Sequence, residues 1–180
     1  MTVKYFAYGS NLDLPQMKRR CPSSKLISKG SLSGYRLTFN RFSSGWGGGV
    51  ADVIQDQGSK VWGLVFELSD TDLERLDRYE GYHKDWTSLY ERWKTVIDTP
   101  NGQVSDVWVY TVVEKQKFVK PTPEYLQIIK DAAVKWNFPK AYLTLAYLDA
   151  LYEDRGDEIT RRIRWELIDS KLMDEVERLK

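Results

Sequence analysis

The chain has 180 residues, enough for one domain with a substantial hydrophobic core. Its 27 Lys and Arg residues balance 26 Asp and Glu residues, so net charge gives no reason to expect a nucleic-acid or anionic-membrane partner. Cys21 is the only cysteine, which excludes an intrachain disulfide and fits a reducing compartment.

The first distinctive stretch, residues 5–12, reads Tyr-Phe-Ala-Tyr-Gly-Ser-Asn-Leu. It begins as a hydrophobic run typical of a strand and breaks at a small polar turn, where Gly9 tolerates unusual backbone angles. Asp13 then offers an N-cap for a short basic helix over residues 14–20. A strand, a glycine turn and a helix start leave backbone N–H groups that can converge on an anion such as a carboxylate. An ordinary strand-to-helix turn would use the same residues, so this stretch alone leaves both interpretations open.

Strand patterns fill the next part of the chain. Residues 33–42 alternate apolar and polar side chains, and residues 50–55 and 60–68 are predicted to be two strands that pair with each other. Gly63, inside the second of these, indicates a bulge or a close backbone approach. Residues 43–49 contain four glycines, and we expect them to form a mobile connecting loop.

A helix and a hairpin follow. Residues 70–80 are predicted to form a helix that Ser69 caps at its start and Gly81 ends. Residues 89–98 and 104–113 are predicted to be strands, and the turn Thr-Pro-Asn-Gly between them indicates an antiparallel hairpin.

Helical patterns dominate from Pro121 onward, and a charged helix is expected over about residues 158–179. Two apolar stripes precede it: Tyr125, Ile128, Ile129, Ala132, Ala133 and Trp136, and then Leu143, Ala146, Tyr147, Ala150 and Leu151. Because the strands come first and the helices cluster late, we expect an α+β fold in a single domain. We place the domain at residues 1–152 and a charged helical extension, packed on the same domain, at residues 153–180.

Composition also limits the location of the protein and its chemistry. No apolar run approaches the roughly 20 residues that cross a bilayer, and residues 1–12 lack a signal-peptide pattern, so we expect a cytoplasmic protein. One His and one Cys, far apart, argue against a Cys/His nucleophile pair and exclude a Cys/His-rich zinc site. Any chemistry must come mostly from carboxylates, hydroxyls and backbone donors.

Glu80 stands out among the acids because it lies at a predicted helix end, beside Gly81. A negative charge there is mildly unfavourable, by about 0.3–1 kcal/mol, and so calls for an explanation. The carboxyl could point back toward the sheet, whereas a surface glutamate would account for the position equally well.

Several segments, taken in order, resemble the γ-glutamylcyclotransferase family. Residues 5–12 look like its signature loop, and residues 76–81, Leu-Asp-Arg-Tyr-Glu-Gly, look like the segment that carries its catalytic glutamate. Further similar segments are residues 34–39, 61–66, 121–125 and 138–142. The resemblance spans residues 3–151, and the conjunction is far more specific than any single piece.

The resemblance implies a mixed or antiparallel, barrel-like sheet with flanking helices, and an enzyme that needs no metal or cofactor. In such an enzyme the α-amine of a γ-glutamyl group attacks its own γ-carbonyl, releasing 5-oxoproline and a free amine or amino acid. Glu80 would be the catalytic base. The residues that hold the substrate would be Phe6, Ala7, Tyr8, Gly9, Ser10, Asn11, Tyr125 and Tyr90. Residues 82–89 form a longer segment than in mammalian-type enzymes, so the match of Tyr90 to a family tyrosine stays open.

Other functions stay open beside this one. The enzyme could act on a different γ-glutamyl conjugate, or the same fold could be a non-catalytic module that binds a γ-glutamyl compound or another small ligand. A structural partner protein that uses its last helix is a third alternative. We expect a small-molecule γ-glutamyl substrate, with no nucleic-acid or membrane partner, and the C-terminal extension leaves the oligomeric state open, a homodimer included.

Overall fold

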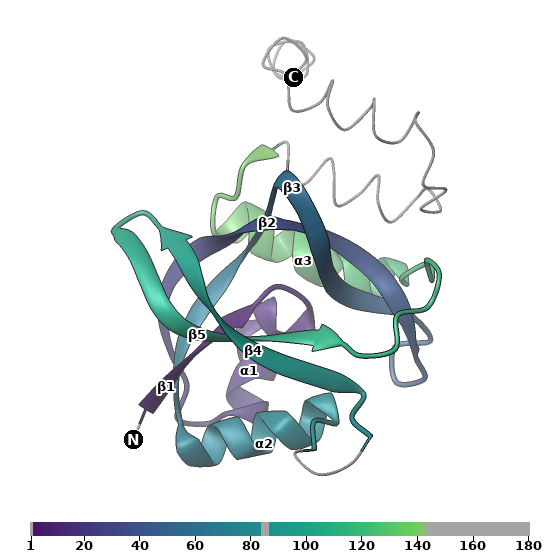
Figure 1. The fold of residues 1–180 in the computed structure, drawn as a ribbon, viewed down its shortest axis with the longest axis horizontal. Coiled ribbons are helices and arrows are strands. Elements are labelled where there is room, and N and C mark those ends of the chain that lie inside the picture. Colours follow the sequence, from purple (N-terminus) through teal and green to yellow (C-terminus); the bar gives the residue numbers. More distant parts are fainter. Residues whose placement is uncertain (1, 84–86, 141, 143–180) are drawn as a thin grey trace, which may run out of the picture.

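The computed structural model describes residues 2–83, 87–140 and 142, and a closed β-barrel forms its centre (Figure 1). The strands of the barrel are β1 (Thr2–Ala7), β2 (Lys25–Ser43), β3 (Gly48–Ser69), β4 (Tyr90–Thr99) and β5 (Gly102–Val112). Their order is β1-β3-β2-β4-β5, and the barrel closes where β5 pairs with β1. The β1–β5 pair is parallel and the other pairs are antiparallel, which confirms the predicted mixed, barrel-like sheet and the α+β class.

The long β2–β3 hairpin differs from the prediction. Residues 50–55 and 60–68 do not pair with each other, because both belong to the single strand β3 and both pair with β2. The polar residues 56–59 resemble a turn in sequence, but they remain within β3 and only shift the register of its pairing with β2. The pairing moves from Ser33↔Lys60 to Tyr35↔Gln55, and Gly58 takes a φ of +91° at this point.

The glycine-rich connection is shorter than predicted. Only residues 44–47 form the turn, whereas Gly48 and Gly49 already belong to β3. The backbone amide of Gly49 donates to the carbonyl of Lys120 at 2.9 Å. A Cβ atom on Gly49 would come within 1.9 Å of the Val119 carbonyl oxygen, so the glycine is explained by this close approach of two backbones.

The predicted helix ends are confirmed by their caps. Helix α1 (Leu14–Arg20) begins with the Asp13 side chain, which accepts from the amide of Gln16, and a single 3-10 turn, η1 (Ser10–Leu12), precedes it. Helix α2 (Asp70–Glu80) begins at Ser69, and Gly81 ends it with a φ of +65°. These caps arise from residues close in sequence, which is why the sequence predicts them well.

Helix α3 (Pro123–Lys135) presents its predicted apolar stripe to the core, with Tyr125, Ile129, Ala132 and Ala133 buried. Figure 1 shows α1 and α2 together near one end of the barrel and α3 behind β2 and β3. The two later helices predicted for the chain, and the extension at residues 153–180, lie outside the described residues.

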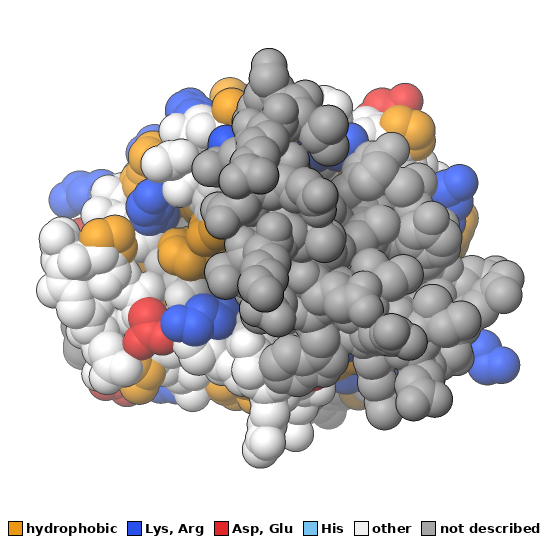
Figure 2. All heavy atoms as spheres, turned by 90° about the horizontal axis from the view of Figure 1, so that it is seen from above, with side chains coloured by type: hydrophobic (Ala, Val, Ile, Leu, Met, Phe, Trp, Pro, Cys, Tyr) orange, Lys and Arg blue, Asp and Glu red, His pale blue; other side chains and the backbone are white. Residues whose placement is uncertain are grey.

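The barrel is packed tightly at the end of β1, beside its antiparallel neighbour β3. A Cβ atom on Gly63 would lie 2.2 Å from the carbonyl oxygen of Ala7, so the predicted close backbone approach at Gly63 is confirmed. On the face shown in Figure 2, described Lys and Arg side chains are scattered among hydrophobic ones. None of the helices in the described ranges is both long enough and apolar enough to span a membrane.

Candidate active site

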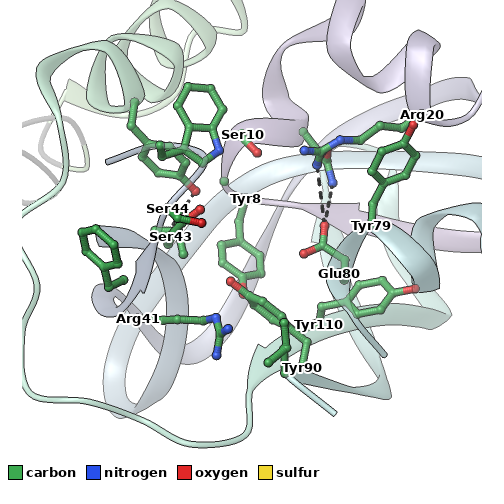
Figure 3. A pocket seen from close by; sticks show the side chains of 18 of the residues that line it. Tyr8, Ser10, Arg20, Arg41, Ser43, Ser44, Tyr79, Glu80, Tyr90 and Tyr110 are labelled. Carbon is green, nitrogen blue, oxygen red and sulfur yellow. Dashed lines mark hydrogen bonds and ion pairs between the residues drawn. The ribbon is translucent and has the colours of Figure 1, made fainter. Parts of the chain in front are cut away.

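A pocket of about 280 Å³ brings the predicted functional segments together (Figure 3). Its wall combines the loop after β1, the end of α2, the start of β4 and the first turn of α3. The predicted site residues that line it are Tyr8, Gly9, Ser10, Asn11, Glu80, Tyr90 and Tyr125. These residues are far apart in sequence, so the barrel and its helices assemble the site.

Glu80 is the last residue of α2, and its carboxylate faces the loop after β1. The Asn11 side-chain amide donates to Glu80 Oε1 at 3.2 Å, and a guanidinium nitrogen of Arg20 lies 3.8 Å from the same oxygen. Only 18% of the Glu80 side chain is exposed. Burial raises the pKa of this carboxyl, while the charge of Arg20 and the hydrogen bond from Asn11 lower it. The carboxyl is therefore held in the pocket and not in bulk water.

Asn11 connects the loop to this carboxyl. Its side-chain Nδ2 also donates to the Tyr5 hydroxyl at 2.9 Å, and its Oδ1 accepts from Arg20 at 2.7 Å. The Arg20 guanidinium in turn lies over the Tyr79 ring, 5.1 Å from its centroid. Because both the nitrogen and the oxygen of the Asn11 side-chain amide are hydrogen-bonded, this side chain is held in one position beside the Glu80 carboxylate.

Tyr125 explains why the loop carries a glycine. A Cβ atom on Gly9 would lie 2.8 Å from the Tyr125 hydroxyl oxygen. The φ of Gly9 is −113°, and the space taken by the Tyr125 hydroxyl requires a residue without a Cβ atom here. The Tyr125 oxygen accepts from the amide of Ala51 at 3.0 Å. Burial raises the pKa of Tyr125 to about 12, and hydrogen bonds from the backbone of Ala51 and Ser10 lower it.

Three further tyrosines shape the pocket. The Tyr8 hydroxyl donates to the carbonyl of Tyr110 at 2.6 Å, and the Tyr110 hydroxyl donates to Asp77 at 2.6 Å. Tyr90 lines the pocket and lies under the Arg41 guanidinium, which is 5.7 Å from its ring centroid. Burial raises the pKa of Tyr8, Tyr90 and Tyr110. These hydroxyls therefore stay protonated at neutral pH and can donate hydrogen bonds.

Phe6 and Ala7 are placed differently from the other predicted site residues. Both are fully buried, and neither lines the pocket. They pair with Val65 and Leu64 of β3 and so anchor the strand from which the pocket loop begins. Their side chains belong to the barrel core.

The sequence did not single out several residues that line the pocket, among them Arg20, Arg41, Trp46 and Tyr110. Trp46 lies in the turn between β2 and β3 and meets the Tyr125 ring edge-on, with 5.0 Å between centroids. Arg20 is one of three basic residues at the end of α1, and no local feature separates it from the other two. Only its position beside Glu80 does so.

The fold and the site define a small barrel protein whose pocket pairs one buried carboxyl with a Tyr-Gly-Ser-Asn loop. Residues 5–131 match the family model described as "Gamma-glutamyl cyclotransferase, AIG2-like". The chain therefore belongs to this family, as its resemblance in sequence predicted.

Similar proteins bear the same description. The chain is 30% identical to a γ-glutamylcyclotransferase of Bos taurus over 142 residues, covering 77% of this chain and 73% of the relative. It is 29% identical to the γ-glutamylcyclotransferase of Mus musculus over 145 residues, covering 78% and 75% of the two chains. A solved structure titled "Gamma-glutamyl cyclotransferase" matches with a TM-score of 0.74 and 26% identity, covering 92% of this chain and 99% of that one.

Proposed function

We propose that this protein is a γ-glutamylcyclotransferase that converts a γ-glutamyl amino acid or γ-glutamyl amine into 5-oxoproline and a free amino acid or amine. Family membership and the named relatives support this reaction. The observation that carries it in the structure is the Glu80 carboxyl, held inside the pocket 3.2 Å from the side chain of loop residue Asn11.

The reaction joins two parts of one molecule. The α-nitrogen of the glutamyl group attacks the γ-carbonyl carbon, a new C–N bond closes the five-membered ring, and the original amide C–N bond breaks. Nucleophile and electrophile belong to the same substrate, so the task of the pocket is to bend that substrate until the two atoms meet. Orientation of this kind supplies up to about 7–11 kcal/mol of the barrier in favourable cases.

In this proposal Glu80 is the group that moves protons. The α-nitrogen enters as an ammonium and must lose two protons, and the leaving nitrogen gains two when it departs as an ammonium. A carboxylate that takes protons from the first nitrogen and delivers them to the second balances the reaction. Burial raises the pKa of Glu80 from the ordinary value of a glutamate, which makes it a better base than an exposed carboxylate.

In this proposal the loop and Tyr125 hold the glutamyl part. Asn11 lies in the helical turn after Gly9, where its backbone N–H can face an anion or a developing oxyanion, while the backbone of Ser10 already donates to Tyr125. The Tyr125 oxygen already accepts from the Ala51 amide, so its own O–H proton is directed elsewhere and can donate to a substrate oxygen. Together they orient the glutamyl group against Glu80.

The test is the replacement Glu80→Gln, which keeps the shape of the side chain and removes its basicity. We expect 5-oxoproline release from a panel of γ-glutamyl amino acids and amines to fall by about 100- to 10,000-fold, the usual contribution of general acid–base catalysis. Glu74→Gln is the matched control, because Glu74 is exposed on the same helix and does not line the pocket.

An undiminished rate in Glu80→Gln would remove Glu80 from the role of base. If the wild-type protein binds members of the panel, detected as thermal stabilisation, but releases no 5-oxoproline from any of them, the protein is a binding module instead.

A further inference from the structure

Among the partly buried arginines of the described residues, Arg41 is the one that has no carboxylate partner. Arg20, Arg36, Arg75 and Arg92 each lie within 4.0 Å of a carboxylate, their partners being Glu80, Asp56, Asp72 and Asp77. Arg41 is half-buried as they are, yet no described carboxylate pairs with it. A guanidinium stays charged at any physiological pH, so this charge enters the pocket without an anionic partner.

The guanidinium is nevertheless held in place. Arg41 is near the end of β2, where it pairs with Val50 of β3. Its guanidinium lies over the Tyr90 ring at 5.7 Å from the centroid, a cation–π contact that orients it within the wall of the pocket. Tyr90 therefore holds the Arg41 guanidinium in the wall of the cavity.

The charges of the pocket are arranged at two ends. Figure 3 shows Arg20 beside Glu80 on one side and Arg41 on the other, with Tyr8 between them. The charged side chains of the described lining are two guanidinium groups and one carboxylate, which leaves one positive charge. A γ-glutamyl amino acid carries two carboxylates and one ammonium, hence one negative charge, whereas a γ-glutamyl amine is neutral overall.

The direction of the bound substrate follows from the proposed function, on which this inference rests. If Glu80 lies within reach of the α-nitrogen and of the leaving nitrogen, the substituent on the leaving nitrogen extends away from Glu80, toward the opposite end of the pocket. Arg41 is the cation at that end.

We propose that Arg41 is a specificity-determining residue that binds a carboxylate on the leaving group. The planar guanidinium can donate two parallel hydrogen bonds, one to each oxygen of such a carboxylate. The favoured substrates of this protein are then conjugates whose leaving amine bears a carboxylate, in preference to γ-glutamyl amines of the same shape.

The test compares γ-glutamylalanine with γ-glutamylethylamine, which lacks only the carboxylate of the leaving group. The measured quantity is the ratio of kcat/KM for the first substrate to kcat/KM for the second. We expect this ratio to fall roughly 10- to 100-fold in Arg41→Gln, the usual value of a charge-assisted hydrogen bond, and to recover in part in Arg41→Lys, which restores a point charge. Arg36→Gln is the matched control, since it removes one positive charge from the same strand outside the pocket, and its ratio should equal that of the wild type.

An unchanged ratio in Arg41→Gln overturns the proposal, and so does an equal loss for both substrates, which would place Arg41 on the glutamyl part. Failure of the reaction itself is separable, because the wild-type protein would then release no 5-oxoproline from either compound. In that event calorimetric Kd values decide: tighter binding of γ-glutamylalanine that is lost in Arg41→Gln supports the carboxylate site, and equal Kd values refute it.

Discussion

Glu80 lies under opposing influences. Removal from water favours the protonated carboxyl, whereas the Arg20 guanidinium at 3.8 Å and the Asn11 amide at 3.2 Å favour the carboxylate. Burial is the largest of these effects, so the pKa lies above that of a free glutamate. The proposed role of base requires a group that is ionised when it accepts a proton and yet has a substantial affinity for that proton, and this balance favours both.

We predict that Arg20→Gln shifts the pH dependence of kcat/KM. Loss of the guanidinium removes an influence that lowers the pKa of Glu80, so that pKa rises and the acid limb of the profile moves to higher pH. The measurement is kcat/KM for 5-oxoproline release across the acid and neutral range. Arg19→Gln, an exposed neighbour that does not line the pocket, should leave the limb where it is. A limb that moved to lower pH in Arg20→Gln would contradict the assignment of this limb to Glu80.

At the scale of the element, helix α2 places Glu80 at its last position and then ends at once. Gly81 takes a φ of +65° and a ψ of 35°, and its amide donates back to the carbonyl of Arg78. The same residue leaves room for Leu89, whose Cδ1 would lie 2.9 Å from a Cβ atom at position 81. The cap thus controls both the helix end and the chain that follows Glu80.

We predict that Gly81→Ala destabilises the protein by about 1–2 kcal/mol through the left-handed backbone, with an added contribution from the clash with Leu89. Because Glu80 is the preceding residue, kcat/KM should fall as well. The measurements are urea unfolding and 5-oxoproline release. Gly34→Ala is the control: its φ is +80°, nothing lies within 4 Å of the added Cβ, and it does not line the pocket. Gly34→Ala should lose stability but keep its activity. An equal loss of activity in both variants would mean that lower stability, and not a displaced Glu80, reduces the rate.

At the scale of the whole molecule, a buried polar network links strands that are not neighbours in the barrel. Asp52 of β3 is completely buried and accepts from the Thr111 hydroxyl at 2.7 Å and from the Val112 amide at 2.9 Å, both on β5. Asn40 of β2 donates to it at 2.7 Å, and the Lys115 ammonium lies 3.1 Å away. Asp52 directly follows Ala51 in β3, so the network also holds the Ala51 amide in position. This amide donates to the Tyr125 hydroxyl in the pocket.

We predict that Asp52→Asn costs about 3–5 kcal/mol of unfolding free energy, since it leaves a cation beside buried donors without its carboxylate. Chemical denaturation measures the loss. Asp106→Asn is the control, because Asp106 and Lys94 form an exposed pair and such pairs contribute only about 0–1 kcal/mol. If the two variants lost equal stability, the Asp52 network would not be the structural link described here.

The elements that the sequence predicts best are those whose cause is local. The caps Asp13, Ser69 and Gly81 act within a few residues, and the Thr-Pro-Asn-Gly turn joins neighbouring strands. The β3 prediction was wrong for a tertiary reason. Residues 56–59 resemble a turn locally, but pairing with β2 on either side of them keeps one continuous strand.

By itself, the sequence determined the family, the α+β class, the helix caps and the segments that meet at the site, because each depends on residues close together or on motifs in order. Only the tertiary structure decided that Arg20 and Arg41 lie at the two ends of the pocket and that Phe6 and Ala7 belong to the core. Glu80 and Asn11 are 69 residues apart. Their contact depends on how the barrel closes and where α2 packs against it, and no local sequence pattern predicts that these two side chains meet.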